Sequence, residues 1–312
     1  MNPLHFIDFD AYASAIRGVD LDVRLIHPLR QQHLWSLQEI ELHSLRLQFA
    51  AEGSGILAFG KMHQSGWGLY FQLSGIPVCV NGLRIGPGAM AVFPPNAEFG
   101  IAGHGAVSWF SVFVPERLLF GDTEPTIRRS SVFVPQLKNQ EFKRLYSQAR
   151  KIQKYSERLG FSSLHSPDFV ILQDVLVSTV CEVLRNGDAP GAQGSNTNAR
   201  RLTAQALELI HDYQGLKMSV RNLAVILDVS ERTLEYAFRD QFDISPQAFL
   251  INYRLHQARK SLQSSDPGES TVAMAAAENG FFDFGRFAAK YRQLFGEHPS
   301  VTLHRSFGNQ DS

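Results

Sequence analysis

The chain has 312 residues, 44% of them hydrophobic and 19% charged, and its 30 basic and 30 acidic residues give a formal net charge of zero. This composition excludes a wholly disordered chain, and the length suggests two domains that each bury a core. Because the net charge is zero, bulk electrostatics gives no support for nucleic-acid binding, and only sequence patterns can indicate it.

The location of the protein is predicted from features that the sequence lacks. No apolar run approaches the roughly 18 residues that span a bilayer, and the first residues lack the basic flank and apolar stretch of a signal peptide. Two cysteines, Cys79 and Cys181, cannot build a disulfide framework, and we expect both to be small buried hydrophobic residues. The sequence therefore predicts a cytoplasmic protein without membrane contact.

The segment from about 40 to 115 alternates apolar and polar residues with a period of two, as half-buried strands do. The alternation is clear at 45–49 and again from Phe110 to Val114. Asn81-Gly82, between two short apolar runs, is a strong hairpin signal, since both turn residues must adopt positive φ. Several short strands with regular turns predict an antiparallel barrel or sandwich.

After Pro135 the apolar spacing changes to three and four residues, which predicts amphipathic helices at about 138–159 and 167–186. Ser166-Pro167 provides an N-cap and a first-turn proline for the second helix. Two such helices can cover the open side of the β-domain, and they can also form a dimer interface. The sequence leaves both roles open, and the two are compatible.

A small, polar and glycine-rich stretch at 187–199 predicts a flexible linker. It separates a domain at 1–186 from a helical domain at 200–312. The predicted fold class is therefore α+β, with an N-terminal antiparallel β-barrel and two helices followed by an all-α domain.

The helical domain contains a first candidate DNA-binding unit at 219–242. Ser219 can cap a short helix, and Asp228-Val229-Ser230 forms a tight turn in which Val229 is the apolar plug. Ser230 can then cap a second helix with Leu234 and Phe238 on its inner face. A short helix, a tight turn with a buried aliphatic residue and a capped second helix are typical of a helix-turn-helix unit.

The same pattern recurs at 271–295, where Gly280 permits the tight corner, Phe281 is the plug and Asp283 can cap the second helix. Between the units, Ser245-Pro246 begins a helix that runs to about Ser264. At 1.5 Å per residue this connecting helix is about 28 Å long. That length is close to the roughly 34 Å of one DNA turn, so both second helices are expected to enter adjacent major grooves.

Residues 201–307 resemble the DNA-binding domain of the AraC/XylS regulators. The second unit carries the family signature at Val272-Ala273, Ala276, Gly280-Phe281, Phe287, Lys290-Tyr291, Phe295-Gly296 and Pro299-Ser300. The turn-rich stretch 82–95 gives the N-terminal region a looser likeness to the family's cupin-like sensing and dimerising domain. The resemblance implies double-stranded DNA as a partner, a homodimer, and activation through contacts with RNA polymerase.

The candidate DNA contacts lie on the two second helices. Arg232 and Arg286 are interpreted as base-reading residues, because arginine can donate two hydrogen bonds to guanine; the alternative is an ordinary exposed arginine. Phe284 can pack on a thymine methyl group, and the helix N-termini can hold phosphates without side-chain charge. The full prediction comprises Ser230, Glu231, Arg232, Thr233, Tyr236 and Arg239 in the first unit and Phe284, Gly285, Arg286, Ala289 and Lys290 in the second.

The remaining chemistry-bearing residues have two interpretations each. Four aromatic residues of the barrel can line an effector pocket or simply fill the core, namely Trp67, Tyr70, Phe71 and Trp109. His63 and His104 stand alone, whereas a metal needs three or four convergent ligands, so neither a metal nor another cofactor is expected.

Three functions compete. The first is a transcription regulator, most simply an activator, whose N-terminal domain either senses a small-molecule effector or only dimerises. The second is a DNA-binding regulator without an effector, controlled by its abundance or by a protein partner. The third is an enzyme fused to a DNA-binding module, but no residue next to Cys79 or Cys181 would lower a thiol pKa, and no hydrolase or phosphate-loop motif occurs. We therefore expect a regulator and not an enzyme.

Overall fold

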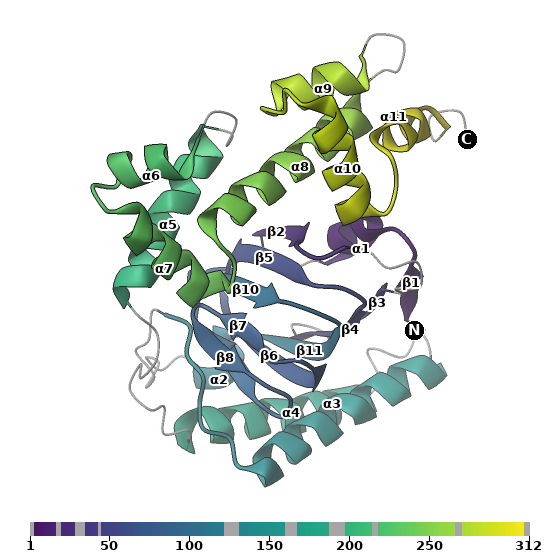
Figure 1. Ribbon diagram of the computed structural model, residues 1–312. Coiled ribbons are helices and arrows are strands. Elements are labelled where there is room, and N and C mark those ends of the chain that lie inside the picture. The colour runs from purple at the N-terminus through teal and green to yellow at the C-terminus, as the bar shows by residue number, and fades with distance from the viewer. Residues whose placement is uncertain are drawn as a thin grey trace. The chain divides into compact units, whose positions relative to one another are not determined.

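The computed structural model (Figure 1) describes residues 3–16, 20–28, 35–42, 45–121, 131–159, 167–186, 197–213, 218–265 and 270–308. The chain forms two compact units. The first comprises 1–23, 33–53 and 58–194, and the second comprises 24–32, 54–57 and 195–312. Of the predicted linker at 187–199, residues 187–196 lie outside the described residues, as does the predicted N-cap Ser166.

The N-terminal strands form two antiparallel sheets. The larger has the order β1 (Leu4–Phe6), β3 (Trp35–Leu42), β4 (Leu45–Glu52), β11 (Val107–Pro115), β6 (Gly66–Gly75) and β9 (Met90–Phe93). The smaller has the order β2 (Asp20–Leu25), β5 (Ile56–Lys61), β10 (Glu98–Gly103), β7 (Val78–Val80) and β8 (Leu83–Ile85). The helices α1 (Phe9–Ala15) and α2 (Glu116–Phe120) lie between strands and after the last strand.

The Asn81-Gly82 turn forms the predicted hairpin between β7 and β8. Both turn residues have positive φ, 48° at Asn81 and 80° at Gly82, and Val80 pairs with Leu83 across the turn. Local turn chemistry therefore determines this pairing, because few other residue pairs tolerate two consecutive positive φ angles.

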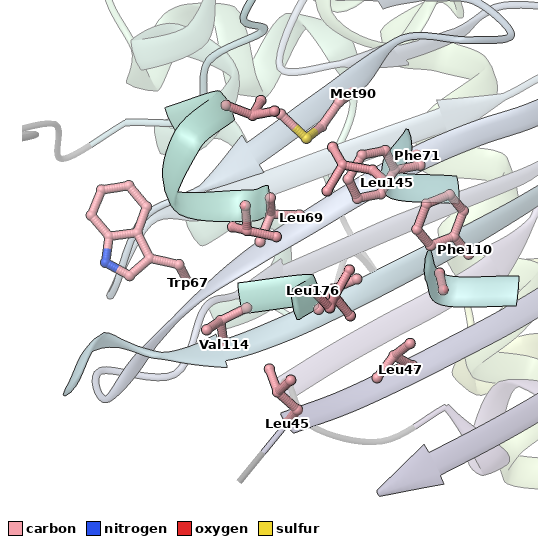
Figure 2. Close-up of a cluster of buried hydrophobic side chains, with 14 of the residues drawn as sticks. Leu45, Leu47, Trp67, Leu69, Phe71, Met90, Phe110, Val114, Leu145 and Leu176 are labelled. Atoms are coloured by element: carbon pink, nitrogen blue, oxygen red, sulfur yellow. The ribbon is translucent and has the colours of Figure 1, made fainter. Parts of the chain in front are cut away.

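Two long helices, α3 (Asn139–Leu159) and α4 (Pro167–Asn186), cover one face of the larger sheet. Their bounds match the predicted helices at about 138–159 and 167–186. The core between sheet and helices includes Leu45, Leu47, Trp67, Leu69, Phe71, Phe110 and Val114 from strands, with Leu145 of α3 and Leu176 of α4 (Figure 2). Phe71 and Phe110 stack within it, with ring centroids 4.2 Å apart.

The second unit contains seven helices in the described part of the chain, which are α5 (Thr197–Asp212), α6 (Val220–Ile226), α7 (Glu231–Phe242), α8 (Pro246–Ser264), α9 (Val272–Glu278), α10 (Phe284–Phe295) and α11 (Pro299–Gly308). An antiparallel β-domain followed by helices and an all-α domain confirms the predicted fold class. None of the described helices is both long enough and apolar enough to cross a membrane.

Candidate nucleic-acid interface

The first helix-turn-helix unit is α6, a tight turn and α7. Asp228 adopts a left-handed backbone conformation with φ 51°, and the amide of Val229 donates to the Ala224 carbonyl at 3.0 Å. The Ser230 hydroxyl accepts from the Thr233 amide at 3.0 Å, which confirms the predicted cap of α7. Val229 is only partly buried, so the predicted plug is less complete than expected, and fully buried Leu234 holds α7 to the unit.

The second unit, α9, a turn and α10, repeats this geometry with one residue more. Gly280 has φ 77°, and the amide of Phe281 donates to the Ala276 carbonyl at 2.9 Å, as Val229 does to Ala224. The Asp283 carboxylate then accepts from the Arg286 amide at 2.9 Å and caps α10 as predicted. Phe281, predicted as core, is only partly buried because the turn holds it near the surface against Phe287, with centroids 5.0 Å apart.

The candidate residues of α7 all lie on the exposed side of the helix. Tyr236 is 60% exposed, and the other predicted contacts, Ser230, Glu231, Arg232, Thr233 and Arg239, are exposed as well. The Arg239 guanidinium pairs with Glu235 at 2.9 Å. The exposed surface of α7 therefore carries hydroxyl and guanidinium groups, which can donate hydrogen bonds to base edges or phosphates, and carboxylates, which can accept from cytosine amino groups.

The exposed surface of α10 is chemically different. Phe284 is 47% exposed, and Gly285, Ala289 and Lys290 are exposed too. The Arg286 side chain is 84% exposed, with its Nε atom 3.5 Å from the Asp283 carboxylate. The sequence analysis did not name Phe282, the residue directly before the cap Asp283. The available signal was the turn between Gly280 and Asp283, which is one residue longer than the corresponding turn of the first helix-turn-helix unit.

Comparison with known proteins places this geometry in a family. Residues 223–305 match a family described as "Helix-turn-helix domain". The probable thc operon regulatory protein of Rhodococcus erythropolis is 28% identical over 149 residues, 45% of each chain. The XylDLEGF operon transcriptional activator 3 of Pseudomonas putida is 33% identical over 101 residues, 32% of this chain and 30% of its own. Residues 223–305 therefore form a helix-turn-helix domain, and over less than half of its length the chain is similar to transcriptional regulators.

The matched regions span less than half the length of both relatives. The solved structure of the AraC-like transcriptional activator CuxR is similar over 83% of this chain and 96% of its own, with 15% identity and a TM-score of 0.41. The matched family model covers both helix-turn-helix units from Leu223 onward, the part of the chain that the sequence analysis interpreted as DNA-binding.

The second helices of the two helix-turn-helix units, α7 and α10, rest on different supports. On the inner side of α7, its own Phe238 and Phe242 pack with Phe249 of α8, and the three ring centroids lie 5.4–5.9 Å apart. Behind α10 lies a polar network centred on buried Arg259 of α8, whose guanidinium donates to Glu297 at 2.8 Å and to the Tyr291 hydroxyl at 3.2 Å.

Glu297 keeps its charge within this network. Burial acts to raise the pKa of the Glu297 carboxyl, but hydrogen bonds from Thr302 and Arg259 and the charges of Arg259 and Arg305 outweigh it, so the pKa is lowered. The carboxylate accepts from the Thr302 hydroxyl at 2.8 Å and also pairs with Arg305. Its charge thus anchors α11 to α8 behind the second recognition helix.

The four aromatic residues predicted to line a pocket do not converge on one site. Trp67 and Phe71 belong to the core between the larger sheet and the helices α3 and α4. Tyr70 points to the other side of β6 and packs on Trp109 with centroids 5.8 Å apart. All four are buried.

Next to Trp109 lies a buried carboxyl group that the sequence analysis missed. Glu52 accepts from the indole Nε1 of Trp109 at 2.7 Å and from the Tyr12 hydroxyl at 3.0 Å. Burial raises the pKa of the Glu52 carboxyl to about 7, although the two hydrogen bonds act to lower it. Burial therefore favours the protonated form of this carboxyl.

No group of three or more His, Cys, Asp or Glu side chains within the described ranges is arranged to hold a metal. His63 instead pairs through Nδ1 with the Ser65 hydroxyl at 2.7 Å. Cys79 is buried as predicted, whereas Cys181 is half-buried and donates to the Leu119 carbonyl at 3.4 Å. Burial raises the pKa of the Cys181 thiol, which makes it a poor nucleophile.

Proposed function

We propose that the protein is a bacterial transcription activator that reads two adjacent major-groove segments with α7 and α10. The observation that carries this proposal is the pair of capped helices with exposed N-terminal turns, joined by the 19-residue helix α8. At 1.5 Å per residue α8 is about 28 Å long, which suits two grooves one DNA turn apart. We infer activation, and RNA polymerase as a partner, from relatives described as transcriptional activators.

In this proposal the two helices use different contacts. Arg232, exposed at the second position of α7, donates to guanine, while Ser230 and Thr233 at the start of the helix face the phosphates. The amides at the N-terminus of α10 bind a phosphate beside Gly285. The positive charges of Arg239, Lys290 and Arg292 contact phosphates of the DNA backbone. The protein acts in the bacterial cytoplasm, at the nucleoid when it is bound to DNA.

The test is selection of genomic DNA fragments by the full-length protein at two salt concentrations. We expect a few promoter regions to be enriched and to persist at the higher salt, because base contacts do not release counterions. An Arg232→Ala variant should lose this enrichment, whereas Arg84→Ala, which removes an exposed arginine from β8, should keep it. Uniform binding that disappears at the higher salt would contradict the proposal.

We further propose that the N-terminal compact unit, which contains the sheets and the helices α3 and α4, forms a homodimer through these two helices. The support is the outer surface of α4, where Val170, Ile171 and Val175 are exposed and Ile171 reaches 61%. A groove of about 420 Å³ beside this surface is lined by Lys151, Lys154, Tyr155, Arg158, Asp168, Ile171 and Leu172. Because a twofold interface pairs each surface with itself, basic side chains on α3 can face acidic side chains on α4 of the second copy.

Sedimentation of the full-length protein tests the dimer. We expect a dimer at micromolar concentration, and we expect Ile171→Asp to yield a folded monomer because the new charge would be buried. Ile76→Asp, at an isoleucine that is 47% exposed outside α3 and α4, is the matched control and should remain dimeric. A monomeric wild-type chain would remove this part of the proposal.

A second candidate function is regulation without a small-molecule effector. The observation that favours it is the burial of Trp67, Tyr70, Phe71 and Trp109 in two separate packing arrangements. The discriminating experiment unfolds the purified protein, removes small molecules by dialysis, refolds it and repeats the fragment selection. Unchanged enrichment supports regulation without an effector, and enrichment restored only by cell extract of low molecular mass supports an effector.

A further inference from the structure

The turn of the second helix-turn-helix unit contains one residue more than that of the first. One residue, Val229, lies between the positive-φ residue Asp228 and the cap Ser230, whereas two residues lie between Gly280 and the cap Asp283. The additional residue is Phe282, directly before the cap. Its side chain is 83% exposed, although it is a phenylalanine. A large apolar side chain at the leading end of a recognition helix is therefore presented to solvent in the absence of DNA.

Further exposed residues with apolar or very small side chains follow Phe282 on α10. Phe284, the first residue of the helix, is 47% exposed, and the exposed residues Gly285 and Ala289 have little or no side chain. Arg286 is the one hydrogen-bonding side chain among the first three residues of α10, and Asp283 lies 3.5 Å from its Nε atom. Hydrogen bonding from side chains is thus sparse where the helix would meet base edges.

The largest apolar group on the base edges of the major groove is the 5-methyl of thymine. We propose that Phe282 and Phe284 together recognise thymine methyl groups and restrict the half-site of the second unit to sequences with thymine at the contacted positions. This inference rests on the proposed function, because it requires α10 to lie in a major groove. It adds Phe282 as a specificity-determining residue and gives the second unit a recognition chemistry different from that of the first.

Uracil substitution in the DNA isolates this contact. Uracil has every hydrogen-bonding group of thymine and lacks only the methyl, so replacing single thymines of the selected site removes nothing else. We expect one or two positions in one half of the site to lose about four-fold in affinity, which corresponds to about 0.8 kcal/mol for one buried methyl-sized group. Thymines in the half bound by α7 should tolerate uracil.

A change in the protein tests the same contact that uracil substitution tests in the DNA. Phe282→Ala in the full-length chain should bind the thymine site about four-fold more weakly than wild type and should no longer distinguish thymine from uracil at the sensitive position. Because Phe282 is 83% exposed, the melting temperature should not change. Tyr213→Ala, which removes an aromatic side chain that is 61% exposed at the end of α5, is the matched control and should keep full uracil sensitivity. Phe284→Leu retains an apolar contact and should keep part of it.

The outcomes separate this inference from the proposed function. If the full-length protein selects no specific DNA, the proposed function fails. If it selects a site but no uracil position changes the affinity, the methyl contact is wrong while the regulator remains. If Phe282→Ala weakens binding equally to thymine and uracil sites, Phe282 acts by another contact, such as insertion between base pairs, and the inference is also overturned.

Discussion

The two helix-turn-helix units share a backbone but differ in chemistry. Counted from the N-caps Ser230 and Asp283, Arg232 of the first unit corresponds to Gly285 of the second, and Tyr236 corresponds to Ala289. Long polar or aromatic side chains in α7 thus stand where α10 has almost none. The caps and the positive-φ turn residues determine the fold of each unit, while the exposed positions remain free to specify different DNA contacts.

The supports behind the two helices differ as well. Phenylalanine rings pack between α7 and α8, whereas buried Arg259 and the carboxylate of Glu297 lie behind α10. Apolar packing tolerates substitutions of similar volume, but a buried ion pair loses much of its stability when one partner is removed. We therefore expect the second unit to be the more sensitive to single changes in its support.

The largest effect is expected for Arg259→Met, which keeps the volume but removes the guanidinium from the network. The unfolding free energy of the C-terminal helical unit should fall by about 3 kcal/mol, because the partly buried Glu297 carboxylate is left with Arg305 as its remaining basic partner. Chemical denaturation of the full chain measures this. Arg239→Met removes an arginine from the exposed pair with Glu235 and should cost less than about 0.5 kcal/mol.

The same network predicts a pH dependence with a definite sign. The pKa of Glu297 is lowered from 4.5 in the folded protein, so its stabilisation is present above pH 4.5 and is lost as the pH falls through the lower folded value. Glu297→Gln should remove this part of the acid sensitivity. An unchanged acid transition in the variant would show that this network does not stabilise the second helix-turn-helix unit.

Arg232→Ala should have the next largest effect, this time on DNA binding. We expect a loss of about 1–3 kcal/mol together with relaxed specificity at one base pair, because Arg232 has no counterpart in the second unit. Arg286→Ala should lose less, since the carboxylate of Asp283 competes with DNA for its guanidinium. Binding assays on the selected site and its single-base variants measure both. Equal losses on all sequences would instead assign Arg232 to a phosphate.

Gly285→Ala tests whether α10 approaches DNA by its backbone. A Cβ atom at Gly285 would meet only the Asp283 carboxylate, at an ordinary 3.5 Å, so the protein should fold normally. Alanine in place of glycine should stabilise the helix by about 0.5–1 kcal/mol. We expect DNA affinity to fall nonetheless, because the new methyl separates the helix from the groove. Increased stability with unchanged DNA affinity would show that α10 does not approach DNA by its backbone at Gly285.

The sequence predicted the features that depend on neighbouring residues and missed those that depend on distant ones. The caps Ser219, Ser230, Ser245 and Asp283 could be recognised because each acts on an amide three residues away. The hydrogen bond from Arg259 to Glu297 joins residues 38 apart, and no local pattern indicates it.

The candidate sites show the same limit. Alternation along β6 separates Tyr70 from Trp67 and Phe71, but only the structure shows that α3 and α4 cover the side with Trp67 and Phe71. Phe282 was missed for a different reason, since a phenylalanine beside Phe281 is expected in the core. The length of the turn, and not the residue type, places Phe282 outside.

The smallest effect on stability is expected at the polar surface of α7 in the first helix-turn-helix unit. Glu235 pairs with Arg239 one turn along α7, at 2.9 Å, and both side chains are roughly half exposed. Glu235→Gln should lower stability by about 0.3–0.5 kcal/mol, the usual value for such a pair. DNA binding should nonetheless strengthen slightly at low salt, because the change removes a negative charge near the phosphates and releases Arg239 to contact them.

Salt dependence distinguishes this explanation from a lost base contact. If Arg239 gains one phosphate, the slope of log affinity against log salt concentration should steepen by about 0.9. If Glu235 instead accepts from a cytosine amino group, Glu235→Gln should weaken binding to the selected site alone and leave the slope unchanged. The second result would extend hydrogen-bonded base recognition along a further turn of α7, and so would widen the difference from the apolar surface of α10.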